Sequence, residues 1–230
     1  MNILRKWRYR ARCRKLAASC TQPVLADYLE TCTCTRAGHI RNTPLIAADL
    51  ELTGLDANSN QIIAIGWTLV DKGRVRFGSN RHLLVTAQQS VGSSAAIHEL
   101  VDSDVAGGIA LDEALTELFQ AARGRIWVFH HAGLDVAFLR KACQEWAGVS
   151  PPFPVLDTMQ IELAQRKRRD QHVQDGDLQL SRLRSQYRLP RYTAHDALID
   201  AIATAELLLA MAAQLDRKAP LPLASHVRIF

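Results

Sequence analysis

An apolar strand segment that carries two acids constrains the fold more than any other feature of the chain. Residues 45–52 read LIAADLEL, so Asp49 and Glu51 stand two positions apart in a segment that is otherwise apolar. Side chains two apart on a β-strand point to the same face of a sheet. Two neighbouring carboxylates repel each other and resist burial unless a cation lies between them. A solvated edge strand is the alternative, and the four apolar residues before Asp49 disfavour it.

The chain after residue 44 predicts strands first and then alternating strands and helices. Apolar runs separated by turn-forming residues predict an antiparallel meander of three strands, over 45–52, 61–70 and 74–79. Helical spacing of apolar residues predicts helices over 111–122, 134–147 and 196–215. Residues 125–131 predict a buried strand between the first two helices, and the charged segment 166–177 predicts a mobile loop. This order predicts an α/β protein with a mixed sheet flanked by helices.

Basic charge is concentrated in the first 43 residues, which hold nine Lys and Arg against two acids. The remaining residues hold 19 bases and 21 acids, so the excess of positive charge belongs to the N-terminal part. Residues 3–18 and 24–30 predict helices, and 38–44 predict a linker. Such a segment can bind a phosphate backbone or anionic lipid, and a solvated helical extension is an equally good explanation. We therefore divide the chain into an extension (1–43), a body (44–215) and a C-terminal tail (216–230).

The cysteines and the hydropathy pattern bear on location. Four of the five cysteines lie near the N-terminus, at positions 13, 20, 32 and 34, with spacings that do not match a zinc site. No apolar run approaches the roughly 18 residues that a membrane helix needs. Without a secretory signal, we expect reduced thiols, a cytoplasmic location and no membrane partner. The Arg-rich residues 3–17 also imitate a mitochondrial presequence, which we consider the weaker interpretation.

Three further titratable residues occur at element boundaries. Asp135 follows the predicted strand at the start of a helix, where a carboxylate also serves as an ordinary helix-end residue. His195 and Asp200 stand five positions apart at the start of the long helix. A surface or capping imidazole and a solvent-facing acid are the simple alternatives for these two. Each residue alone is a weak signal, but the order Asp-x-Glu, Asp, His-x₄-Asp on these elements is hard to obtain by chance.

Three sequence blocks carry a resemblance to a known family: DLELTGLD (49–56), HHAGLDVAFL (130–139) and HDALIDA (195–201). With them the chain resembles the DEDDh 3′→5′ exonucleases of the ribonuclease H-like fold, which are related to the proofreading epsilon subunit of bacterial DNA polymerase III. The resemblance covers about residues 44–212. It implies that the body is an exonuclease domain with a ribonuclease H-like sheet, and it implies nothing about the extension.

The resemblance implies a two-metal mechanism. Asp49, Glu51, Asp135 and Asp200 would hold two Mg²⁺ or Mn²⁺ ions, for which oxygen ligands are suited, with Asp49 bridging both. His195 would act as general base, because an imidazole can accept a proton from the attacking water near neutral pH. The expected reaction is hydrolysis at the 3′ end of single-stranded or frayed DNA, which releases 5′-mononucleotides.

Substrate contacts are also implied by the resemblance, at Thr53, Gly54, Leu55, His98, His130 and His131. The sequence departs from the family pattern at Leu52, His131 and Leu134, where relatives usually have Thr, Asn and Phe. Single-strand binding normally adds stacking aromatics. Trp67, Phe129 and Phe138 are near the blocks, but their spacing favours the core.

Two other functions remain open from the sequence. One keeps the fold and changes the substrate, giving an exoribonuclease that trims short RNA or RNA 3′ ends. The other is a non-catalytic module that binds nucleic acid or a DNA polymerase through its basic extension. Retention of all five catalytic-type residues disfavours the non-catalytic module.

Overall fold

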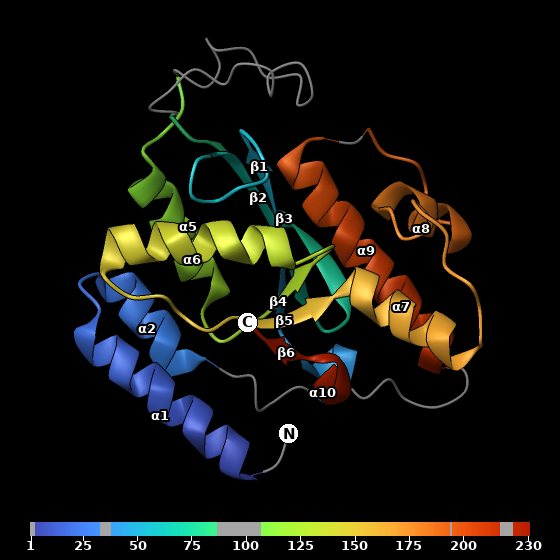
Figure 1. Cartoon of the computed structure of the whole chain (residues 1–230), viewed down its shortest axis with the longest axis horizontal. Coiled ribbons are helices and arrows are strands. Elements are labelled where there is room, and N and C mark those ends of the chain that lie inside the picture. The colour runs from blue at the N-terminus through green and yellow to red at the C-terminus, as the bar shows by residue number, and fades with distance from the viewer. Residues whose placement is uncertain (1–2, 33–37, 87–106, 194, 217–222) are drawn as a thin grey trace.

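The structure, a computed structural model, describes residues 3–32, 38–86, 107–193, 195–216 and 223–230 (Figure 1). Its centre is a six-stranded sheet in the order β3-β2-β1-β4-β5-β6. The strands are β1 (Leu45–Leu52), β2 (Ile62–Asp71), β3 (Arg74–Leu84), β4 (Ile126–Phe129), β5 (Pro154–Asp157) and β6 (Arg228–Ile229). The α/β class and the mixed sheet predicted from the sequence are confirmed.

The sheet combines two pairing modes, as the order of the sequence segments predicts. β1, β2 and β3 form an antiparallel meander, whereas β4 and β5 are parallel to β1. β1 lies between β2 and β4, and nearly all of its residues are buried. An apolar strand with covered faces is expected at the centre of such a sheet. Asp49 and Glu51 are therefore attached to a buried strand at the centre of the protein.

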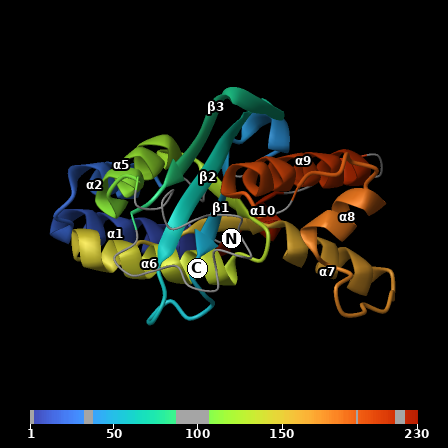
Figure 2. The same cartoon turned by 90° about the horizontal axis from the view of Figure 1, so that it is seen from above.

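Helices cover both faces of the sheet and form two apolar cores (Figure 2). One group packs on the first face: α1 (Ile3–Ser19), α2 (Pro23–Thr31), α5 (Leu111–Ala122) and α6 (Gly133–Ala147). The other face is covered by α7 (Thr158–Arg168), α8 (Leu180–Gln186), α9 (Ala197–Asp216) and α10 (Leu223–His226). α9 is long and apolar enough to cross a membrane, but half of it is buried and it packs against the sheet as a core helix.

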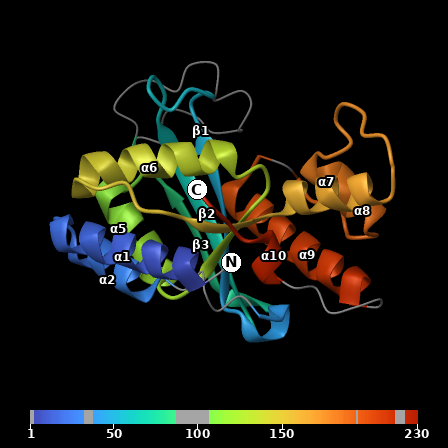
Figure 3. The ribbon, with the colours of Figure 1, turned by 60° about the horizontal axis from the view of Figure 1, so that its bottom comes forward.

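The N-terminal extension contains the two predicted helices, and both pack on the body (Figure 3). Tyr28 of α2 is fully buried, and its hydroxyl accepts a hydrogen bond of 2.9 Å from Trp127 Nε1 of β4. Both rings lie edge-on to Phe119 of α5. The predicted linker 38–44 includes the short 3₁₀ helix Ile40–Asn42, whose first residue is also buried. The extension thus contributes side chains to the same core as the exonuclease-like blocks.

The C-terminal segment that the sequence marks as a tail also joins the fold. Arg228–Ile229 form β6, which pairs antiparallel with β5 at the edge of the sheet. Phe230 and Phe153 exchange two backbone hydrogen bonds of 3.0 and 3.1 Å. The described part of this segment is therefore held to the body by main-chain bonds.

The charged segment 166–177 differs from its prediction as a solvated, mobile loop. Arg166 is only 7% exposed and lies in the last turn of α7. Its guanidinium forms ion pairs of 3.1 Å with Glu162 and with Asp177. Arg166 can be buried because paired charges are tolerated in the interior where unpaired ones are not, and the mobility of the segment stays a prediction.

Candidate active site

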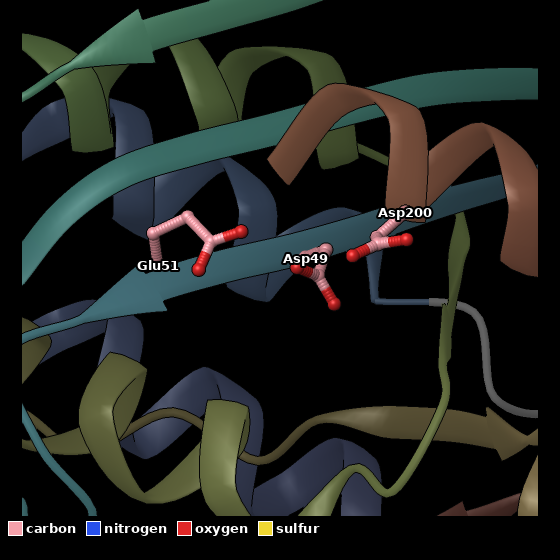
Figure 4. A group of neighbouring side chains, drawn as sticks. All are labelled: Asp49, Glu51 and Asp200. Carbon is pink, nitrogen blue, oxygen red and sulfur yellow. The ribbon is translucent and has the colours of Figure 1, made fainter. Parts of the chain in front are cut away.

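Three of the predicted acids converge above the central strand. Asp49 and Glu51 project from the same face of β1, and Asp200 projects toward them from the first turn of α9 (Figure 4). One carboxylate oxygen from each lies within 4.8 Å of the others. Residues about 150 positions apart in the chain are therefore brought into one cluster by the packing of α9 on the sheet.

A glycine allows α9 to begin this close to the sheet. Gly66 of β2 faces the start of α9, and a Cβ atom placed on it would lie 2.1 Å from the backbone carbon of Ala197. Any side chain at this position would collide with main-chain atoms, which cannot rotate away. The absence of a side chain at Gly66 thus lets α9 pack close enough to β2 for Asp200 to approach Asp49.

Asp135 comes from the other side of β1. β4 pairs with β1 only as far as Ala47, and α6 begins a few residues after β4 ends. Asp135, in the first turn of α6, is 7% exposed. It lies outside the tight group of three oxygens, but its charge is the largest contribution after burial to the raised pKa of Asp49. Asp135 therefore belongs to the same electrostatic site.

Burial raises the pKa of all four acids, and the charges of neighbouring carboxylates add to the shift. Burial and the other carboxylates raise the pKa of Asp49 well above its usual value and that of Glu51 to about 8. Burial also raises the pKa of Asp135 to about 7, although backbone hydrogen bonds oppose the shift. The pKa of Asp200 is raised by burial too. A divalent cation would relieve this repulsion, and hard oxygen donors fit Mg²⁺ or Mn²⁺.

His195 lies at the edge of this cluster. Its backbone N–H donates a 3.0 Å hydrogen bond to Asp200 Oδ2, and its proximity partly offsets the rise in the pKa of Asp200. The residue is exposed and has a φ of 70°, a left-handed conformation that ordinary side chains seldom adopt. The structure therefore brings all five DEDDh-type residues to one region, with the imidazole on the solvent side.

Two more acids, Asp196 and Asp157, adjoin the site, and the sequence predicts no role for either. Asp196 accepts a 2.9 Å hydrogen bond from Ile199 N at the start of α9, and its charge helps to raise the pKa values of Glu51 and Asp200. Asp157 accepts hydrogen bonds from the backbone of His131 and Ala132 at 3.2 and 3.1 Å, just before α6. The sequence signal for a role of Asp196 is its position next to His195. Asp157 lies in LDT (156–158), where an Asp before a helix is an ordinary N-cap signal.

The β1–β2 turn holds the first group of predicted substrate contacts. Thr53 Oγ1 donates to Asn60 Oδ1 at 3.2 Å and accepts from Gln61 N at 3.0 Å, so this side chain closes the turn. Gly54 packs against Asn60, whose Oδ1 would lie 2.4 Å from a Cβ at this position. Leu55 is 82% exposed at the tip. An exposed leucine on a braced turn beside the acids is consistent with the contact to a terminal base that the resemblance implies.

The predicted histidine contacts are placed differently from one another. His130 is largely buried, and both ring nitrogens are engaged, Nδ1 with Thr158 Oγ1 at 2.7 Å and Nε2 with Leu178 O at 2.8 Å. Its ring therefore joins β4 to α7 and to the segment before α8. His131 is exposed with a φ of 69°, and His98 lies outside the described residues.

Two of the departures from the family pattern are packing positions. Leu52 is 7% exposed in the core, and Leu134 packs against the same core from α6. The third, His131, occupies a left-handed position in which Asn is favoured. These departures leave the four acids in place.

The sheet order and the flanking helices define a ribonuclease H-like α/β fold, with a cluster of carboxylates on its central strand. A sequence model of the family described as Exonuclease (RNase_T) matches residues 46–208. The chain belongs to this exonuclease family.

Individual proteins agree with this assignment. The chain is 27% identical over 169 residues to the 3′-5′ exonuclease DinG of Staphylococcus haemolyticus, covering 73% of this chain and 18% of the relative. It is 28% identical over 177 residues to a DNA polymerase III subunit epsilon-like protein of Rhodobacter capsulatus, covering 74% and 24%. The chain thus spans less than a quarter of the length of these curated relatives.

Solved structures show the same fold. Exonuclease X in complex with 5′ overhanging duplex DNA has a TM-score of 0.58 and 20% identity, covering 79% of this chain and 98% of that one. E. coli Exonuclease I in complex with a 5cy-dT13 oligonucleotide has a TM-score of 0.60 and 14% identity, covering 76% of this chain and 42% of that one. The ribonuclease H-like fold expected from the sequence is confirmed.

Proposed function

We propose that this protein is a metal-dependent 3′→5′ exonuclease that acts on single-stranded or frayed DNA and releases 5′-mononucleotides. The observation that carries the proposal is the meeting of Asp49, Glu51 and Asp200 oxygens within 4.8 Å, with Asp135 beside them. Membership of a 3′-5′ exonuclease family supports the direction of attack. The dT13 complex of Exonuclease I supports a single-stranded DNA substrate.

The residues divide the chemistry between them. Asp49, Glu51, Asp135 and Asp200 would hold two Mg²⁺ or Mn²⁺ ions, which supply charge to offset that developing on the phosphate and on the departing 3′ oxygen. His195 accepts the proton of the attacking water, and its backbone N–H orients Asp200. The exposed Leu55 contacts the terminal base, while the Thr53–Gln61 bonds hold its turn in place.

Product analysis tests the proposal directly. The full chain is incubated with a 5′-labelled DNA oligonucleotide and Mg²⁺ or Mn²⁺, and a ladder of shortened labelled products is expected. EDTA should abolish the ladder, as should Asp49→Asn, which removes one charged ligand and little volume. Asp175→Asn, at an exposed acid outside the site, is the matched control and should be fully active. If the Asp49→Asn enzyme is active, Asp49 is not an essential metal ligand. If neither DNA nor RNA gives a ladder, the proposed exonuclease activity is wrong.

An exoribonuclease is the first alternative substrate assignment. Discrimination between DNA and RNA depends on whether the site accepts a 2′-OH beside the scissile bond. Parallel time courses on DNA and RNA oligonucleotides of equal sequence measure the preference. Faster hydrolysis of the RNA oligonucleotide would show that RNA is the preferred substrate, with the same residues forming the site.

A non-catalytic module is the second alternative, with a DNA polymerase or a nucleic acid as partner. The support for a polymerase partner is the name of one relative, a DNA polymerase III subunit epsilon-like protein. Tight, metal-independent DNA binding by the wild-type chain without any hydrolysis would favour this alternative.

The cytoplasmic location expected from the cysteines and hydropathy stays a prediction.

A further inference from the structure

A groove lined by α8, the segment before α9 and α9 itself adjoins the acid cluster. Its volume is about 710 Å³. His195 and Asp200 belong to its lining, together with Arg182, Arg191 and Tyr192. The groove therefore connects the candidate metal ligands with two arginines and one aromatic ring.

The aromatic ring is held in place before any ligand binds. The guanidinium carbon of Arg184 lies 4.3 Å from the centroid of the Tyr192 ring, and Tyr192 donates a 3.1 Å hydrogen bond to Glu206. Arg184 is itself fixed, because it donates to Ala203 O at 2.8 Å and pairs with Glu206 at 2.9 Å. A ring whose orientation is already fixed loses little conformational entropy when a ligand stacks on it.

The Tyr192 ring is partly exposed to solvent. Arg184 is buried and lies over one face of the ring, Tyr192 is 40% exposed, and both residues line the groove. The aromatic residues near the sequence blocks are not available for stacking, since Trp67, Phe129 and Phe138 are at most 3% exposed. Among the large hydrophobic side chains exposed in the described ranges, Tyr192 is the aromatic one that lines this groove.

Positive charge accompanies the ring. Arg191 is exposed and, within the described part of the chain, forms no ion pair or hydrogen bond through its side chain. The Arg182 side chain is 56% exposed, although it lies 3.5 Å from Asp177. A nucleic-acid strand that approaches four acids needs compensating cations along its backbone, and both arginines can provide them.

We propose that Tyr192 is a stacking platform for a base of the bound single strand, upstream of its 3′ end, and that Arg191 and Arg182 contact the adjoining phosphates. This inference rests on the proposed function, because it needs a single strand whose 3′ end lies among the acids. Stacking on one face explains an aromatic residue that is exposed, braced and next to the site.

The test measures oligonucleotide binding by the full chain carrying Asp49→Asn, so that the probe is not degraded. Tyr192→Leu keeps apolar bulk and removes the ring, and it should raise the Kd of a fluorescent dT oligonucleotide about tenfold. Tyr192→Phe keeps the ring and should bind within about twofold of the parent, since stacking needs no hydroxyl. Phe77→Leu, at an exposed aromatic on β3, is the matched control and should bind like the parent.

A scan of abasic nucleotides locates the contact. One abasic position near the 3′ end should weaken binding by the parent about tenfold, and the same position should have no effect on the Tyr192→Leu variant. Equal binding by Tyr192→Leu and the parent, or abasic effects that are unchanged by the substitution, would overturn the inference. Wild-type hydrolysis combined with that result leaves the proposed function standing. Absence of both binding and hydrolysis would reject the two proposals together.

Discussion

Gly66 lies directly opposite Asp49 in the antiparallel pairing of β2 with β1. The residue that admits the backbone of α9 thus neighbours the acid at the centre of the cluster. We expect Gly66→Ala to displace the start of α9 and with it Asp200. The added methyl group should cost about 1–3 kcal/mol of unfolding free energy, and a displaced ligand should lower activity by about 100-fold. Thermal unfolding and the ladder assay measure the two effects.

Gly78→Ala is the matched control for this prediction. Gly78 is exposed on β3, and a Cβ at this position would meet nothing within 4 Å. The control should fold and cleave as the parent does. A fully active Gly66→Ala enzyme would show that the close approach of α9 does not position Asp200.

The raised pKa values predict how stability changes with pH in EDTA. Glu51 has a pKa of about 8 in the folded protein, above its unfolded value of 4.5, so the folded state binds the additional proton. Its contribution is fully present below pH 4.5 and is lost as the pH rises through 8. Between these limits the wild type should lose on the order of 4 kcal/mol relative to Glu51→Gln. Urea unfolding of both proteins at pH 5, 6.5 and 8 measures this difference.

Divalent cations should reverse this trend. Mg²⁺ or Mn²⁺ favours the ionised carboxylates, so it should stabilise the wild type more at pH 8 than at pH 5 and release protons on binding. Calorimetry in two buffers of different ionisation enthalpy measures the proton release. Equal stabilisation at both pH values would contradict the assignment of Glu51 to the cation site.

His195→Asn tests the general base without disturbing the backbone. Asn tolerates the left-handed conformation at this position and cannot accept a proton near neutral pH. The turnover rate should fall about 10²- to 10⁴-fold, whereas Mn²⁺ affinity should stay close to that of the parent. His172→Gln, at an exposed histidine outside the site, should leave the rate unchanged. A loss of Mn²⁺ binding in His195→Asn would indicate a positioning role instead.

Tyr28→Phe tests whether the extension is part of the folded body. Trp127 Nε1 donates to the Tyr28 hydroxyl in the core, so the substitution leaves a buried donor without this partner. The expected cost is about 1–3 kcal/mol of unfolding free energy. In a Trp127→Phe background the same change should cost less, because the donor is already absent. Equal costs in both backgrounds would show that the hydrogen bond does not stabilise the packing of α2.

The charge of α1 is best tested by substitution, since removing α1 and α2 would uncover the core. Arg8, Arg12, Arg14 and Lys15 are exposed on the outer side of α1, opposite the buried Tyr9 and Cys13. If α1 contacts the strand, changing these four residues to Gln should lower the salt dependence of oligonucleotide binding by up to about 3 in the log–log slope.

The charge-matched control changes Arg74, Arg76, Lys167 and Arg168 to Gln, at exposed positions on β3 and α7. It should keep the parental slope. An equal slope in both variants would favour the solvated extension over the nucleic-acid contact.

Most of the sheet and the cluster could be predicted because their signals are local. The apolar run with Asp49 and Glu51 is found as β1, and the helical spacing of 111–122 gives the bounds of α5. Asp135 and Asp200 could be placed because each adjoins a clear element boundary. Local periodicity identifies elements, and sequence order then restricts their arrangement.

The unpredicted features depend on contacts between distant residues. Nothing near Gly66 in the sequence shows that Ala197 lies against it, and nothing near Tyr28 shows Trp127. Tyr192 stands in a segment without periodicity, and only its packing on Arg184 shows that the ring is braced. Burial of Arg166 was missed because a run of charges predicts solvent exposure until its acidic partners are placed.

Pairing with β2 along the whole of β1 has a consequence for how the site adapts. Asp49 and Glu51 are anchored in a strand whose amides should be among the slowest in the protein to exchange with deuterated solvent. His195, in contrast, is exposed and precedes α9, and its backbone N–H donates a hydrogen bond to the Asp200 carboxylate. If the proposed function holds, strand ends of different shape would be accommodated on the exposed His195 side of the site, while Asp49 and Glu51 keep their positions in the sheet.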